Sequence, residues 1–166
     1  MKKKIPWILP GMIILILDRV IKVFIGDVHA VLIPGVIALR SAKNTGMALG
    51  LFQGGAWAIL AVSLVLVIAA YFLLRDMRLA GWAPVGISLM AGGALGNMMD
   101  RAALGYVIDM FDFCLINFAV FNFADICITI GGALFVLLAI LDYKAEVEAE
   151  KAKKPAEMEQ KDEEQA

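Results

Sequence analysis

The sequence has few of the residues on which most metal and thiol sites depend. It contains one histidine and two cysteines among 166 residues. His29 has no second histidine or cysteine at ligand spacing, so neither a metal site nor a cofactor is expected. Cys114 and Cys127 lie in apolar stretches without a CxxC pattern, and both are expected to be buried free thiols. A net charge of −1 gives no indication of a nucleic-acid surface.

Charge is also scarce, and it is unevenly distributed. Only 19% of the residues are charged, and every glutamate lies within residues 142–166. Hydrophobic residues make up 61% of the chain, and the mean hydropathy is +0.82. An average soluble domain is roughly half apolar and about one quarter charged. A soluble globule of this size has too little interior to cover such long apolar runs. The sequence therefore indicates an integral membrane protein.

Four segments are long and apolar enough to cross a bilayer, whose core of about 30 Å needs roughly 20 helical residues. They cover residues 5–25, 56–74, 82–99 and 125–142. The first is expected to be an uncleaved span, because Val28-His29-Ala30 is a poor signal-peptide cleavage site. The predicted fold class is an all-α membrane protein with four transmembrane helices and a small periplasmic β element.

Basic residues predict the orientation of these spans. Lysines precede the first span and follow the fourth, and Arg75 and Arg78 lie between the second and the third. All three clusters fall on one side, which is expected to be the cytoplasm. Residues 26–55 and 102–124 then form the outer segments.

The two outer segments and the tail are predicted to differ. Residues 28–52 are expected to form short strands, because Pro34-Gly35 and further glycines interrupt a stretch rich in β-branched residues. Residues 102–124 are expected to lie at the membrane interface. We divide the chain into a four-span domain, residues 1–143, and a charged cytoplasmic tail, residues 144–166, expected to be a solvated helix that frays.

Polar residues gather where the third span ends and the fourth begins. A charge inside a span costs about 2.5–3.5 kcal/mol, so each needs a partner or a function. On the first span, Asp18 and Lys22 are one turn apart and can form an ion pair, either structural or beside a site. Arg19 is expected to reach lipid phosphates. The denser cluster at the outer face comprises Asn97, Asp100, Arg101, Asp109, Asp112, Asn122 and Asp125.

Several carboxylates beside a single local cation, Arg101, are unusual at a bilayer edge. Two carboxylates held close together share a proton, and such a pair can activate water and protonate a leaving amine. The residue sets of serine, cysteine and HExxH zinc peptidases are absent from the sequence. The residues alone leave three alternatives: aspartyl hydrolysis, a small proton- or ion-conducting membrane protein, and a structural network.

Five motifs in order resemble those of the lipoprotein signal peptidase family, signal peptidase II, over residues 10–135. They are Leu17-Asp18-x-x-x-Lys22, Asn44-Thr45-Gly46-x-Ala48, Gly92-Gly93-Ala94-x-Gly96-Asn97-x-x-Asp100-Arg101, Val107-Ile108-Asp109 and Phe121-Asn122-x-Ala124-Asp125. The resemblance implies a monomeric aspartyl endopeptidase of the bacterial cytoplasmic (inner) membrane, in contact with membrane lipid. Its substrates would be diacylglyceryl-modified prolipoproteins, cut just before the lipidated cysteine, without a cofactor.

The resemblance also implies roles for particular residues. Asp109 and Asp125 would be the catalytic pair, and Asp100 is the main alternative to Asp109, because spacing alone does not separate the two. Met47 and Leu49 stand where the family tends to have alanine and phenylalanine, which bears on the fit of this outer segment to a substrate. The supporting or substrate-binding residues would be Asp18, Lys22, Asn44, Gly46, Asn97, Asp100, Arg101 and Asn122.

Overall fold

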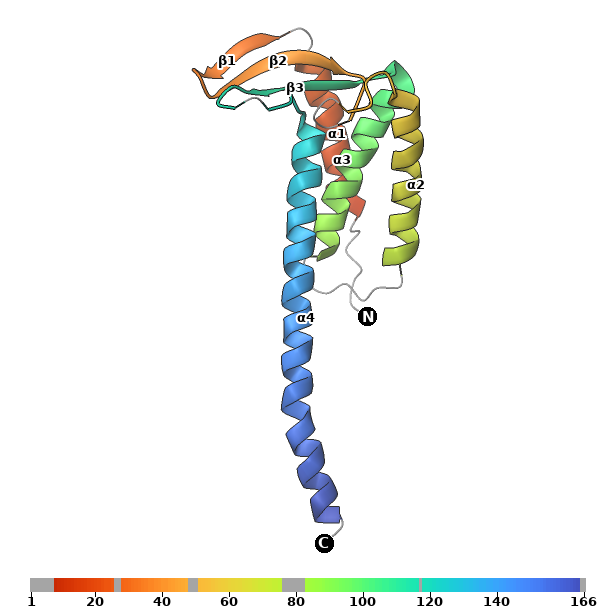
Figure 1. Ribbon diagram of the computed structural model, residues 1–166, viewed down its shortest axis with the longest axis vertical. Coiled ribbons are helices and arrows are strands. Elements are labelled where there is room, and N and C mark those ends of the chain that lie inside the picture. The colour runs from red at the N-terminus through yellow and green to blue at the C-terminus, as the bar shows by residue number, and fades with distance from the viewer. Residues whose placement is uncertain (1–7, 26–27, 48–50, 76–82, 117, 165–166) are drawn as a thin grey trace.

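The computed structural model describes residues 8–25, 28–47, 51–75, 83–116 and 118–164. Within them lie four helices, α1 (Ile8–Ile25), α2 (Ala56–Leu74), α3 (Ala83–Leu104) and α4 (Phe123–Glu164), and three strands, β1 (His29–Ile33), β2 (Ile37–Asn44) and β3 (Val107–Phe113). The helices form a bundle, and the sheet covers one end of it (Figure 1). Several residues used above lie outside the described ranges: 1–7, Ala48, Leu49, Arg78 and Trp82.

The helices agree with the four predicted segments, with two differences in length. α2 has the predicted bounds. α3 continues to Leu104, five residues past position 99, where its span was predicted to end. α4 is one helix of 42 residues, so the expected fraying of the tail is wrong. Alanine, glutamate and lysine dominate the tail, and all three favour helix. Within the described residues, α2 and the Phe123–Ala149 part of α4 are long and apolar enough to cross a membrane.

α2 has no buried side of the kind that a helix of a soluble protein has. Only 6% of its apolar span is buried, and Val65, Leu66 and Tyr71 are each more than 60% exposed. A helix that is apolar on every side and exposed on most of them requires an apolar solvent. The arrangement is that of a membrane protein.

The sheet places one of the predicted catalytic carboxyls over the end of the bundle. Its order is β1-β2-β3, all antiparallel, and Ala42 of β2 faces Asp109 of β3. β1 and β2 confirm the strands predicted in residues 28–52, whereas β3 was not predicted. The backbone of Phe121 pairs with Phe111, which holds the start of α4 beside β3.

The two cysteines differ in exposure. Cys127 is buried on α4, as expected, but Cys114 is exposed, because it follows β3 in a turn. The prediction of two buried thiols is therefore wrong for Cys114.

Glycines on two sides of α3 bring α1 and α4 into close contact with it. On one side, a Cβ at Gly92 would lie 2.4 Å from the Gly11 carbonyl oxygen of α1. On the other, a Cβ at Gly93 would lie 2.5 Å from the Ala124 carbonyl oxygen of α4. Such approaches exclude any side chain, and close backbone contact is how small residues pack membrane helices. Gly92 and Gly93 thus set how closely α3 packs against α1 and α4.

Two neighbouring glycines of α4 give a matched test of this packing. A Cβ at Gly131 would lie 2.6 Å from the Gly86 carbonyl oxygen, whereas the nearest atom to a Cβ at Gly132 is the Met90 sulfur at 3.8 Å. We expect Gly131→Ala to lower the free energy of unfolding by about 1–3 kcal/mol, and Gly132→Ala to leave it unchanged or raise it. Thermal unfolding of both variants in one detergent checks this. Equal unfolding temperatures would contradict the packing described.

Candidate active site

One asparagine joins the two carboxyls of the predicted catalytic pair. Asn122 is fully buried, and its Nδ2 donates to Asp109 Oδ1 at 2.7 Å. Its backbone N–H donates to Asp125 Oδ2 at 3.1 Å, and its Oδ1 accepts from the Asp125 N–H at 3.0 Å. Asn122 directly precedes α4, and Asp125 is the third helical residue, so the pair forms a reciprocal cap of the helix. The bonds that start α4 therefore also position Asp125 beside Asp109.

A second asparagine holds Asp109 from the sheet. Asn44, the last residue of β2, donates from Nδ2 to Asp109 Oδ2 at 2.8 Å. Its Oδ1 accepts the Gly46 N–H at 2.9 Å, which fixes the amide so that its NH₂ group faces the carboxyl. The Gly46 carbonyl in turn accepts from the Arg101 guanidinium at 2.9 Å. The structure thus brings Asn44, Gly46 and Arg101 together around Asp109.

A third asparagine connects Asp125 to a buried cation. Asn97 of α3 donates from Nδ2 to Asp125 Oδ1 at 2.8 Å. Its Oδ1 accepts from Lys22 Nζ of α1 at 3.1 Å. Because the ammonium can only donate, it fixes the Asn97 amide with its NH₂ group toward Asp125. Three helices therefore meet in one chain of hydrogen bonds.

Lys22 belongs to a cluster of two cations and two carboxylates that is buried except for Arg19, which is 30% exposed. Its Nζ lies 3.0 Å from Asp18 Oδ2 and 2.7 Å from Asp100 Oδ2. The Arg19 guanidinium contacts the same two carboxylates, each at 2.5 Å. Arg19 therefore does not reach toward lipid phosphates, and Arg101 is not the only local cation. The sequence offered one signal for Arg19, which is that a charge inside a span needs a partner.

The contacts of Asp100 differ in kind from those of Asp109. Asp100 is 1% exposed and forms ion pairs with two cations, Arg19 and Lys22. Both oxygens of Asp109 accept from neutral amides, and Asp109 is 2% exposed. The two residues that spacing alone left equivalent therefore have different partners: cations at Asp100 and neutral amides at Asp109.

The surroundings of Asp109 favour its protonated form. Burial raises the pKa of its carboxyl to about 6, and the nearby negative charge of Asp125 acts in the same direction. The hydrogen bonds from Asn122 and Asn44 lower the pKa and offset only part of this effect. A carboxyl with this pKa exchanges its proton around pH 6, well above the ordinary range of an aspartate, so it can give and take a proton during a reaction.

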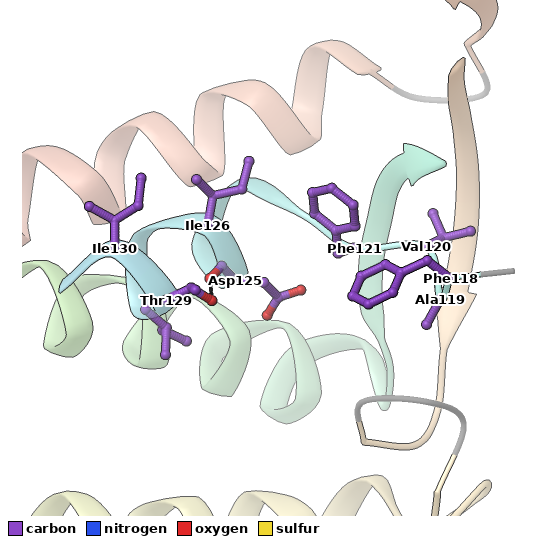
Figure 2. Close-up of a pocket in the computed structure, with 9 residues that line it drawn as sticks. Phe118, Ala119, Val120, Phe121, Asp125, Ile126, Thr129 and Ile130 are labelled. Carbon is purple, nitrogen blue, oxygen red and sulfur yellow. Dashed lines mark hydrogen bonds between the residues drawn. The ribbon is translucent and has the colours of Figure 1, made fainter. Parts of the chain in front are cut away.

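Two hollows adjoin the pair of carboxyls. The larger, about 630 Å³, is lined by Asp125 and mostly apolar residues of α4 and of the segment before it. Figure 2 shows Ile130, Ile126 and Asp125 along α4, with Phe118 and Val120 beyond the start of the helix, beside the strands. The smaller, about 170 Å³, lies beside Asp109 and is lined in part by residues of β2. An extended chain lying across both hollows would pass the two carboxyls.

No group of three or more potential metal-ligating side chains occurs within the described part of the chain. The two carboxyls, oriented by three asparagine amides, are arranged to transfer protons.

Comparisons with known proteins agree on one family. The family model described as signal peptidase (SPase) II matches residues 11–141. The lipoprotein signal peptidase of Lactiplantibacillus plantarum is 38% identical over 133 residues, covering 77% of this chain and 89% of that protein. That of Gloeobacter violaceus is 41% identical over 148 residues, covering 82% and 83%.

The fold is also similar to solved structures of a bacterial membrane enzyme. One has a TM-score of 0.73 and 30% sequence identity, and the match covers 84% of this chain and 90% of that one. Another has a TM-score of 0.69 and 31% identity, covering 81% and 92%.

The buried cluster makes Arg19 important for stability. Arg19→Gln leaves two buried carboxylates with one cation, so we expect the free energy of unfolding to fall by about 2 kcal/mol. The control is Arg40→Gln on β2, whose pair with Asp112 is exposed and should contribute less than about 1 kcal/mol. Thermal unfolding in detergent measures both. A smaller loss for Arg19→Gln than for Arg40→Gln would contradict the role of the cluster.

Proposed function

The chain belongs to the signal peptidase II family, and on that premise we propose that Asp109 and Asp125 are its catalytic pair. It is an aspartic-type lipoprotein signal peptidase, which removes signal peptides from prolipoproteins. The observation that carries the proposal is the bridge through Asn122, which binds one oxygen of each carboxyl and so holds the two groups as a unit.

Asp109 is the proton donor in the proposed reaction, and Asp125 is the general base. Asp125 removes a proton from a water molecule, whose oxygen then bonds to the scissile carbonyl carbon. Asp109 gives its proton to the carbonyl oxygen, forming a neutral tetrahedral intermediate. Asp125 next passes its proton to the amide nitrogen, the carbon–nitrogen bond breaks, and Asp109 takes its proton back. The raised pKa of Asp109 supports its part as a group that carries a proton in the reaction.

The remaining polar residues hold the pair in place. Asn97 and Asn122 orient Asp125, because each donates a hydrogen bond to one of its two carboxylate oxygens. Lys22 fixes the Asn97 amide, and Asp18 and Asp100 balance the charge of Lys22. Asp100 is therefore proposed as a supporting residue.

The substrates are proposed to be prolipoproteins whose cysteine carries diacylglycerol, cut just before that cysteine. The larger hollow supports this, because it is apolar apart from Asp125 and Thr129 and lies along the part of α4 that is apolar enough to cross a membrane. An apolar group attached next to the scissile bond would have an apolar surface beside the base.

We propose four transmembrane spans in the cytoplasmic (inner) membrane, formed by residues 1–143 of a monomer, with residues 144–166 and both termini in the cytoplasm. The charges of α1 are paired within the bundle, which lowers the cost of placing this helix in a bilayer. α1 and α3 begin at the end of the bundle opposite the sheet, and α2 ends there (Figure 1). The site then lies near the outer face, where an exported cleavage site arrives.

The proposed pair is tested by isosteric variants. Asp109→Asn and Asp125→Asn retain side-chain volume but remove proton transfer, so we expect cleavage to fall by about a hundredfold to ten-thousandfold. Purified protein is mixed in detergent with a diacylglyceryl-modified prolipoprotein, and the product is followed by gel shift.

The control is Asp112→Asn, which affects only the exposed pair with Arg40 and should cleave at near the wild-type rate. The unmodified precursor should not be cut. Near wild-type cleavage by either Asp109→Asn or Asp125→Asn would contradict the proposed pair. Complete loss in Asp112→Asn would require a different assignment.

A further inference from the structure

A single residue joins the two segments that carry the catalytic pair. Asp109 lies on β3 and Asp125 at the start of α4, and the backbone of Phe121 links these segments. The Phe121 carbonyl accepts from the Met110 N–H at 2.9 Å and from the Phe111 N–H at 2.8 Å. The Phe121 N–H donates to the Phe111 carbonyl at 3.0 Å. Within the described residues, these three are the backbone hydrogen bonds between β3 and the segment that leads into α4, so they set its register against β3.

The bridge also changes the course of β3 beside Asp109. Two successive N–H groups, those of Met110 and Phe111, share one carbonyl acceptor, which is the pattern of a β-bulge. A bulge bends its strand and turns the side chains next to it. Asp109 directly precedes the bulged residues, and Asn122, which donates to Asp109 Oδ1, directly follows Phe121. The donor and the acceptor of this hydrogen bond therefore both adjoin the bridge.

Aromatic rings distinguish the residues of the bridge from their neighbours. Backbone groups alone do not select a register, because every residue except proline offers the same N–H and C=O groups. The ring centroids of Phe111 and Phe121 lie 5.6 Å apart, which is within the range of attractive aromatic pairs. The Phe118 ring packs edge-on against Phe121 at 5.9 Å (Figure 2). The contact between Phe111 and Phe121 is therefore specific to the register that the structure shows.

On the basis of the proposed function, we propose that Phe111 is a positioning residue for the reaction, because its ring keeps Phe121 in register with β3. This register places Asn122 beside Asp109. Phe111 lines neither hollow, so its ring acts through Phe121 and not on the substrate. A displacement of about 1 Å at a reacting group can lower a rate by about a hundredfold. Loss of the Phe111 ring should therefore lower kcat and leave KM nearly unchanged.

Steady-state cleavage of a diacylglyceryl-modified prolipoprotein measures kcat and KM separately. Phe111→Ala should lower kcat by about tenfold to a hundredfold and leave KM within about twofold. Phe111→Tyr retains the ring and should keep kcat within about threefold of the wild type. Phe111→Leu retains an apolar side chain without the ring and should lower kcat by about fivefold or more. Thermal unfolding in the same detergent shows which variants are folded, and Phe111→Leu decides the test if Phe111→Ala does not fold.

The matched control is Phe113→Ala, two residues further along the same strand. Phe113 faces Ile37 of β2 and lines neither hollow, and among the described residues its ring has no aromatic partner. This variant should leave kcat and KM unchanged. The double variant Phe111→Ala/Phe121→Ala tests the coupling of the two rings. Its kcat should be no lower than that of Phe121→Ala, because the single variant has already lost the contact.

Three results would overturn the positioning role of Phe111 while leaving the peptidase function intact. They are an unchanged kcat in Phe111→Ala, an equal fall of kcat in Phe113→Ala, and losses that multiply in the double variant. Failure of the wild type to cleave any lipidated substrate would overturn the proposed function, and the positioning role with it.

Discussion

The site depends on the burial of two carboxyl groups that are hydrogen-bonded mainly to amides instead of water. Transfer of a charged group from water is costly unless donors replace the lost hydration. Here the donors are the side chains of three asparagines and one backbone N–H. These groups are neutral, so they stabilise a carboxylate less than cations would. The result is a pair that stays protonatable, which is what acid–base catalysis requires.

Each asparagine has one possible orientation because of its second partner. The Asn44 oxygen accepts from the Gly46 backbone, the Asn122 oxygen from the Asp125 backbone, and the Asn97 oxygen from Lys22. The NH₂ groups must therefore face the carboxyls. The charge of Lys22 is balanced within a cluster of two cations and two carboxylates, so the cluster carries no formal net charge.

Close helix packing brings these partners within hydrogen-bonding distance. A Cβ at Gly96 would lie 2.6 Å from Asp18 Oδ2, so only glycine lets α3 approach the carboxylate that binds Lys22. A Cβ at Gly93 would likewise contact the backbone of α4 just before Asp125. Gly93 and Gly96 therefore allow the close helix contacts that bring Asp18 and Asp125 to the polar residues of α3.

Sequence reasoning predicted local features better than contacts between distant segments. The uncharged run of α2 gave its bounds, and the motifs identified Asp109, Asp125 and their three asparagines. β3 was missed, because a short, largely apolar strand has no distinctive pattern until its partner β2 is known. Arg19 was misplaced for a similar reason, since its partner Asp100 is 81 residues away in the sequence.

The most direct measurement is the protonation of Asp109. Infrared difference spectra of the wild type and of Asp109→Asn, taken from about pH 4 to about pH 8, isolate the carbonyl band of the protonated carboxyl. A raised pKa means that the proton is held below about pH 6 and lost above it, so we expect the band to disappear as the pH rises through about 6. A band already lost at about pH 4, the ordinary range of an aspartate, would contradict the role of Asp109 as the proton donor.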